Sequence, residues 1–245
     1  MNKYKIVALI LVMVAISGVV LVQANTSSRY LENGYLSLFY HAVRLEETFP
    51  RINPVGMAIE EFDKAAREDD DSGEAELMMG LIYHYLGRPG TALGYFLEFS
   101  ALHPEEAWVH ALIGDLYVEM GRFDKAEESF ERAIEFAPEG EVFAKAHFGL
   151  GNIALERGDY PQAREAFANA LENAGDFFDA RLGLGMSLYY LAEYDEAIST
   201  LELAQLQAPR SISVFQFLGL SYQAAGLDDQ AQHAFARVEE LKKDN

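Results

Sequence analysis

The sequence contains no cysteine. This absence excludes disulfides, thiolate metal sites, c-type haem attachment and a cysteine nucleophile. Basic residues are also scarce, because 19 lysines and arginines face 39 aspartates and glutamates, which gives a formal charge of −20 at pH 7. Such a surface repels phosphate backbones and anionic lipid headgroups, so we expect no nucleic acid partner. Half of the 245 residues are apolar, which excludes disorder as the main state.

The first residues form a long apolar run. Lys3 and Lys5 precede an uninterrupted stretch of low polarity from Ile6 to Val22. As a helix this stretch would extend over about 26 Å, close to the thickness of a bilayer core. We expect residues 1–24 to be a signal anchor with one membrane span, or a signal peptide cleaved after Ala24. In both cases the lysines stay inside, and the chain from Asn25 onward lies beyond the cytoplasmic membrane, in the periplasm, or is secreted.

Small and aromatic residues recur with a fixed period along most of the chain. The recurring glycines stand at steps of 34, 37, 34 and 34 residues: Gly80, Gly114, Gly151, Gly185 and Gly219. An alanine follows each glycine after twelve residues: Ala92, Ala126, Ala163, Ala197 and Ala231. A large apolar residue follows after sixteen: Phe96, Phe130, Phe167, Leu201 and Phe235. Small residues at two fixed points let two antiparallel helices approach closely, and the large residue fills the remaining space.

This pattern resembles the tetratricopeptide repeat family. The resemblance places five units at residues 73–106, 107–143, 144–177, 178–211 and 212–245. It implies an all-α fold in which helix pairs stack into a right-handed superhelical solenoid, preceded by the N-terminal transmembrane or signal helix. We expect residues 25–72 to be a helical linker with a degenerate capping repeat, because Ala58, Phe62 and Ala65 match the second-helix positions of the later units.

Two irregularities of the repeat lead to local predictions. Glycine ends the first helix of four units at Gly87, Gly121, Gly158 and Gly226, where we expect a left-handed cap. Ala192 replaces this glycine in the fourth unit, so that turn should be strained. The one longer step comes from extra residues around Gly140, which predict a longer loop or an extended helix start.

Three short patterns suggest a cofactor or metal site, and each fails on its context. The run from Gly149 to Ala154 matches a dinucleotide fingerprint, but it falls inside a helix rather than after a strand. The acidic run at residues 69–71 lacks the glutamate of a calcium loop, and His103 and His110 lack the spacing of a zinc helix. We therefore expect no metal, no cofactor and no catalytic residues.

The resemblance also implies a partner-binding groove, because the first helices of such repeats line a concave face. The family's groove positions carry over to Leu77, Leu81, His84, Trp108, Ala111, Asp115, Val118, Phe148, Asn152, Leu155, Leu182, Met186, Tyr189, Gln216, Leu220 and Gln223, with Tyr85 and Tyr190 beside them. An apolar, aromatic groove suits an amphipathic helix or hydrophobic strip of a partner protein. In the alternative interpretation, several of these residues only pack against the next repeat. Without a cluster of basic residues, the groove does not match the family members that hold C-terminal carboxylates.

These features predict a non-enzymatic scaffold or adaptor on the outer face of the cytoplasmic membrane. It would bind a segment of a membrane or exported protein and support the assembly of an envelope complex. Two alternatives remain open: a permanent structural subunit of a membrane complex, and a self-assembling repeat protein.

Overall fold

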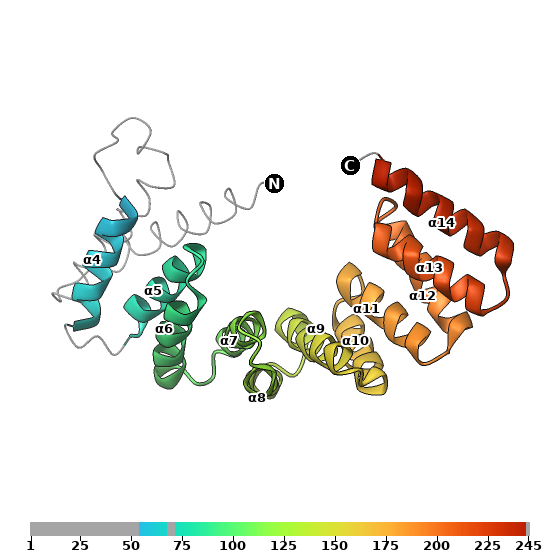
Figure 1. Ribbon diagram of the computed structural model, residues 1–245. Helices are drawn as coiled ribbons and strands as arrows, with labels where there is room; N and C mark the ends of the chain where they lie inside the picture. Colours follow the sequence, from blue (N-terminus) through green and yellow to red (C-terminus); the bar gives the residue numbers. More distant parts are fainter. Residues whose placement is uncertain (1–53, 68–71, 244–245) are drawn as a thin grey trace. The chain divides into compact units, whose positions relative to one another are not determined.

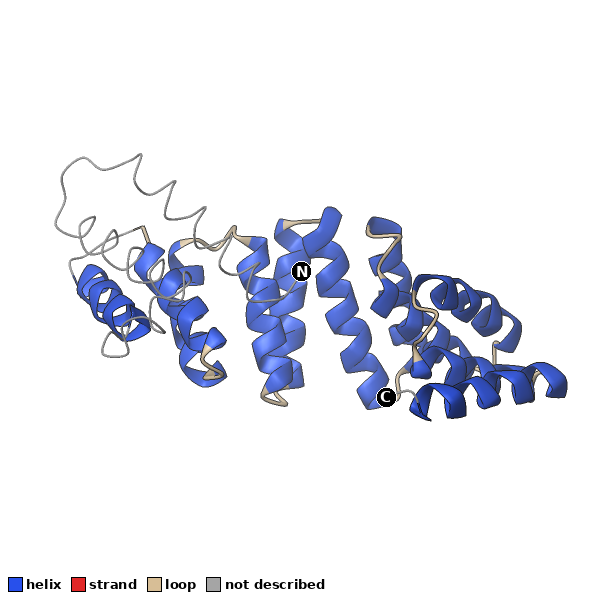
Figure 2. Cartoon of the chain, turned by 90° about the horizontal axis from the view of Figure 1, so that it is seen from above, coloured by secondary structure: helices blue, strands red, loops and turns tan. Residues whose placement is uncertain are grey.

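The computed structural model describes residues 54–67 and 72–243, and every regular element in these ranges is a helix (Figures 1 and 2). The helices are α4 (Pro54–Arg67), α5 (Glu74–Tyr85), α6 (Pro89–Leu102), α7 (Ala107–Glu119), α8 (Phe123–Phe136), α9 (Gly140–Arg157), α10 (Tyr160–Asn173), α11 (Phe178–Tyr190), α12 (Tyr194–Gln207), α13 (Ile212–Ala224) and α14 (Asp228–Lys243). The predicted all-α class is therefore confirmed for the described residues.

The chain divides into two compact units, which meet in sequence between Glu105 and Glu106. In the first unit, α4 packs on α5 and α5 packs on α6. In the second unit, α7 to α14 stack in chain order, and each second helix contacts the first helix of the next pair. The first helices α7, α9, α11 and α13 also contact one another in sequence. They form a row, which we call the first-helix row.

The helix pairs are held together by rings that lie against glycines. Phe130 of α8 is fully buried, and a Cβ atom on Gly114 of α7 or Gly149 of α9 would come within 2.5 Å or 2.4 Å of its ring. Phe167 of α10 is placed in the same way between Gly151 and Gly183. The helices approach closely because these glycines have no side chain. The glycines of the dinucleotide-like run therefore serve helix packing, as the sequence indicated.

The turns within the pairs follow the prediction closely. Gly87, Gly121, Gly158 and Gly226 have φ angles of 68°, 69°, 74° and 76°. Ala192 has φ 60° and is the one residue other than glycine with a positive φ in the described part of the chain. This conformation costs an alanine about 1–2 kcal/mol, because its Cβ crowds the following carbonyl oxygen. The strained turn of the fourth unit is confirmed.

The longer step between the second and third units extends a helix. α9 begins at Gly140 and has 18 residues, which makes it the longest of the described helices. The backbone N–H of Gly140 donates a hydrogen bond to Oδ1 of Asn173, over 3.0 Å, so the end of α10 caps the start of α9. The predicted extended helix start is confirmed.

Part of the predicted capping repeat lies in the described residues. Ala58, Phe62 and Ala65 are fully buried and share a core cluster with Met78 and Met79 of α5, while the assignment of a capping repeat stays a prediction. The first helix of that repeat, the acidic run at residues 69–71 and the apolar segment of residues 1–24 lie outside the described residues. None of the described helices is long and apolar enough to cross a membrane.

Candidate functional site

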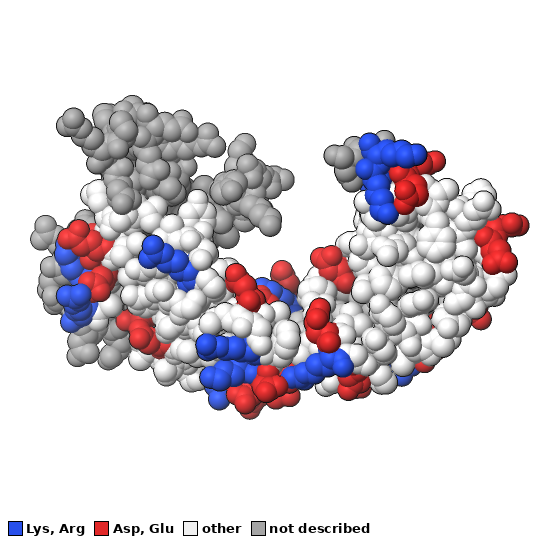
Figure 3. Space-filling view, in the orientation of Figure 1, with Lys and Arg blue, Asp and Glu red and all other residues white. Residues whose placement is uncertain are grey.

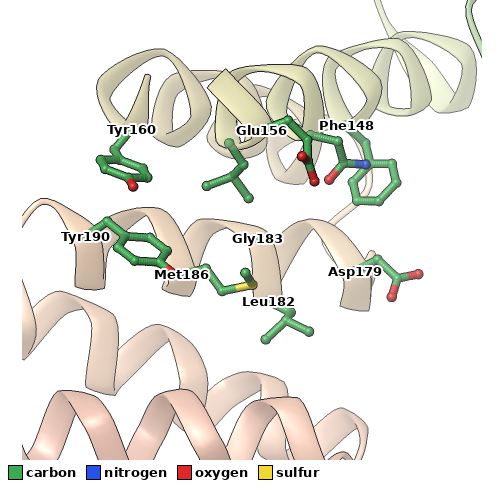
Figure 4. A pocket seen from close by; sticks show the side chains of 10 residues that line it. Phe148, Glu156, Tyr160, Asp179, Leu182, Gly183, Met186 and Tyr190 are labelled. Carbon is green, nitrogen blue, oxygen red and sulfur yellow. The ribbon is translucent and has the colours of Figure 1, made fainter. Parts of the chain in front are cut away.

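Six of the predicted groove residues surround one pocket between α9 and α11. Its volume is about 500 Å³. The six residues are Phe148, Asn152, Leu155, Leu182, Met186 and Tyr190, and the lining is completed by Glu156, Tyr160, Asp179 and Gly183. Figure 4 shows Tyr160 and Tyr190 at one end of the pocket, Phe148 and Asp179 at the other end, and Met186 between them. The pocket thus lies on the first-helix row of the second unit, where the groove was expected.

The shape of the pocket follows from the packing beneath it. Gly183 lines the pocket, and a Cβ atom on it would lie 2.5 Å from the ring of Phe167. This close approach holds α11 against α10. The neighbouring Leu182 and Met186 are half-buried and line the pocket. Helix geometry therefore presents one side of α11 to its neighbour and another side to the pocket.

One end of the pocket is built on a cluster of aromatic rings. Tyr160 stacks on Tyr190 with 4.6 Å between the ring centroids and 13° between the ring planes. Tyr190 also lies 5.3 Å from the ring of Tyr189 and 6.1 Å from that of Phe217. Tyr190 is nevertheless 45% exposed. It therefore offers aromatic surface to solvent while its neighbours hold it in place.

The charged residues of the pocket are acidic. Glu156 and Asp179 are exposed, and within the described part of the chain no lysine or arginine lines the pocket. The lysine and arginine residues closest to the pocket residues in sequence interact with groups that do not line the pocket. Nζ of Lys145 lies 2.8 Å from Oδ2 of Asp115. Figure 3 shows that charged side chains of both signs gather around α7 to α10 on the face in view, whereas the surface over α11 to α13 is largely uncharged.

Two arginines next to the pocket are also engaged. Nη2 of Arg157 lies 2.8 Å from Oδ1 of Asp124, and its Nη1 pairs with Glu127. Nε of Arg181 donates to the side chain of Gln207 over 2.9 Å, and its Nη2 donates to the carbonyl of Gly175. Arg157 thus joins the second and third units, and Arg181 bonds within the fourth unit and to the end of the third, so neither forms an ion pair with Glu156 or Asp179 in the described part of the chain.

Several pocket residues have a packing role as well. Phe148 and Leu155 pack against the core cluster of α9, α10 and α11, and Leu182 packs against that of α12 and α13. Tyr189 is not among the residues that line the pocket; its ring lies 5.8 Å from that of Phe217 and 6.1 Å from that of Tyr194. For Tyr189, the alternative interpretation of a packing role describes the contacts better.

The other predicted groove residues do not line this pocket. Ala111 is only 1% exposed, so its assignment to the groove is wrong: at that position α7 packs too closely for a partner to reach the side chain. Trp108 is 39% exposed, and its Nε1 donates to Glu106 over 2.7 Å. In the first unit, Leu77 and Leu81 are half-buried, while His84 and Tyr85 are exposed. Val118 and Leu220 are half-buried, and Gln216 and Gln223 are exposed.

The repeat could have revealed two of the pocket residues that sequence reasoning missed. Glu156 stands 34 residues before Tyr190, at the same position relative to the recurring glycine. Asp179 corresponds in the same way to Trp108, since each stands six residues before its glycine. Tyr160 comes from the start of α10, and no signal in the first helices points to it.

No constellation of metal ligands emerges in residues 54–67 and 72–243, where no group of three or more histidine, aspartate and glutamate side chains is placed to hold an ion. A ring nitrogen of His103 lies 2.7 Å from the carbonyl oxygen of Ser72. His110 is buried, and its ring stacks on Phe136 at 5.7 Å. His103 therefore takes part in hydrogen bonding within the fold, and His110 takes part in packing.

Tyr222 and His147, which do not line the pocket, have shifted pKa values. Burial, together with a hydrogen bond to Glu202, raises the pKa of Tyr222 to about 12. Burial lowers the pKa of His147, although the charge of Glu165 opposes this effect. Nδ1 of His147 is buried without a hydrogen-bond partner in the described structure. These shifts disfavour the charged form of both side chains.

The comparisons with known proteins agree with this architecture. Tetratricopeptide repeat models match residues 71–139, 111–174 and 148–211, which together extend over more than half of the chain. The chain is similar to the crystal structure of the MamA protein, with a TM-score of 0.63 and 22% identity over 71% of this chain and 93% of that one. It is also similar to YrrB, described as a TPR protein with an unusual peptide-binding site, with a TM-score of 0.65 and 20% identity over 76% of this chain and 95% of that one. No curated protein matches the sequence. The chain belongs to the tetratricopeptide repeat family.

Proposed function

We propose that this protein is a non-enzymatic interaction scaffold that binds a segment of a partner protein on the first-helix row of its second unit. The pocket between α9 and α11 carries this proposal. It combines an exposed aromatic ring, Tyr190, with the apolar side chains of Leu155, Leu182 and Met186. Aromatic anchors in a concave apolar surface are a common energetic centre of protein interfaces. The peptide-binding site named for YrrB, a protein of the same fold, is consistent with this function.

We further propose that the scaffold is anchored in the cytoplasmic membrane and works on its outer face. Lys3 and Lys5 followed by the apolar run to Val22 support this location. The partner would then be a membrane or exported protein, and the scaffold would support the assembly of an envelope complex.

Photocrosslinking from the pocket tests the interaction. A photoreactive amino acid at Leu155 of the full-length protein, in native membranes, should form a crosslink to a partner protein that mass spectrometry can identify. The same amino acid at Glu128, which is exposed on α8 and does not line the pocket, is the matched control and should give no such product. A crosslink between two copies of this chain would favour the self-assembling alternative. Crosslinking that is equal at both positions would contradict a function of the pocket.

The location can be tested with the cysteine that the chain lacks. Cysteine introduced at the exposed Ser213 would be the sole thiol of the protein. A maleimide that cannot cross membranes should label it in intact cells. Labelling only after the membrane is broken would contradict the proposed location.

A further inference from the structure

We propose that the segment bound between α9 and α11 is basic, with lysine or arginine beside apolar residues. This inference rests on the proposed function, because it names the chemistry of the segment that the pocket holds. It follows from the charges of the lining residues, from the pairing of the surrounding cations and from the aromatic rings in the same lining.

In residues 54–67 and 72–243, the carboxylates of the pocket have no ion-pair partner. Glu156 on α9 and Asp179 on α11 are exposed and lie on opposite walls (Figure 4). Neither forms an ion pair within the described part of the chain, while the nearby Lys145, Arg157 and Arg181 are bound to other groups. A bound cation would therefore supply the missing partner on either wall.

The aromatic rings that line the pocket suit the same kind of side chain. The stacked pair of Tyr160 and Tyr190 closes one end of the pocket, and Phe148 lies with Asp179 at the other end. The guanidinium group of arginine stacks on aromatic rings and donates paired hydrogen bonds to carboxylates. Each end of the pocket thus offers an aromatic ring to a cation, and the lining as a whole adds two carboxylates.

The middle of the pocket adds apolar and amide groups. Leu155, Leu182 and Met186 provide surface for an aliphatic side chain, and Asn152 provides an amide that can bond to a peptide backbone. An acidic segment would meet two carboxylates and no compensating cation. The formal charge of −20 on the whole chain would also steer a basic segment toward the protein and repel an acidic one.

Binding of designed peptides to the full-length protein tests this inference. The probes are fluorescent twelve-residue peptides in which two arginines flank two to five leucine or alanine residues. Matched peptides carry glutamine or glutamate instead of arginine. The variants are Glu156→Gln and Asp179→Asn, and the controls are Glu128→Gln and Asp195→Asn, which change exposed acids that do not line the pocket.

We expect the arginine peptides to bind more tightly than the glutamine peptides, and the glutamate peptides to bind least. Each pocket variant should weaken arginine peptide binding about 5-fold, the upper range for a partly exposed ion pair. The control variants should leave binding unchanged, and added salt should weaken it because salt screens exposed charges.

Equal binding of the arginine and glutamine peptides would overturn the inference, and so would binding that survives both pocket substitutions. The crosslink from Leu155 separates this failure from a failure of the proposed function. A captured partner segment without lysine or arginine would overturn the basic segment and leave the interaction function standing.

Discussion

α9 and α11 each have a side that packs against a neighbouring helix and a side that faces the pocket. The two sides differ in which residue types they accept. On the packing side, the recurring Gly151 and Gly185 lie so close to the side chains of Phe167 and Leu201 that even one added methyl group would collide. On the pocket side, the neighbouring Asn152 and Met186 are half-buried and line the pocket. The packing side therefore keeps the same residue types from unit to unit. The pocket side varies, so it can carry the specificity of each repeat.

The largest expected effect comes from removing a ring on the packing side. Phe130→Ala should lower the free energy of unfolding by about 3–5 kcal/mol, because the fully buried ring joins α7, α8 and α9. Urea unfolding followed by circular dichroism measures this loss. Phe136→Ala, on the same helix but 43% exposed, is the control and should cost clearly less. Equal losses would mean that the rings between the glycines do not hold the repeats together.

Adding a methyl group on the packing side should cost somewhat less. Gly183→Ala places its Cβ 2.5 Å from Phe167, so we expect a loss of about 1–3 kcal/mol from overpacking. Gly94→Ala on α6 meets no atom within 4 Å and should instead gain about 0.5–1 kcal/mol, since alanine favours helices more than glycine does. Thermal unfolding of the two variants provides the comparison. A gain in both would contradict the close approach at Gly183.

The turns allow a test in both directions. Ala192→Gly should stabilise the fourth unit by up to about 1 kcal/mol, because it relieves the strain at φ 60° at some cost in chain entropy. Gly158→Ala at the equivalent turn, with φ 74°, should destabilise by about 1 kcal/mol. Hydrogen exchange at the flanking helices would show both effects locally. Shifts of the same sign in the two variants would refute the assignment of strain.

A smaller effect concerns the pH dependence of stability. Burial holds the pKa of His147 below its ordinary value of 6.5 in the folded protein. The unfolded chain therefore takes up this proton first as the pH falls below about 6.5, which favours unfolding. The fall in Tm between pH 7.5 and 5.5 should be shallower in His147→Gln than in the unchanged protein. His233→Gln, at an exposed position on α14, is the control and should leave the slope as it was.

The smallest effect on stability is expected on the pocket side. Glu156→Gln and Asp179→Asn change exposed side chains that form no ion pair in the described structure. Their free energies of unfolding should stay within about 0.5 kcal/mol of the unchanged protein. Urea unfolding provides this measurement beside the peptide binding. A large loss of unfolding free energy would show that these carboxylates support the fold. The packing side and the pocket side would then not have separate roles.

The sequence could predict the repeat register because packing imposes it. The glycine, alanine and aromatic positions lie where expected, and Ala192 has the left-handed conformation that its place in the repeat required. The pocket was predicted in part. Six of its lining residues were named, whereas Ala111 proved to be buried. Glu156 and Asp179 were missed. Their positions relative to the recurring glycine were assigned to the groove in other units, but not in the units to which these two residues belong.

The sequence by itself determined the helical class, the period and the turns, because close helix contacts accept only small residues at fixed intervals. Only the tertiary structure decided which side chains face a common space. Tyr160 reaches the pocket from the start of α10, while Tyr189, which follows the groove spacing, packs among other rings. These outcomes depend on contacts between residues of different helices, and a periodic pattern along one chain does not specify such contacts.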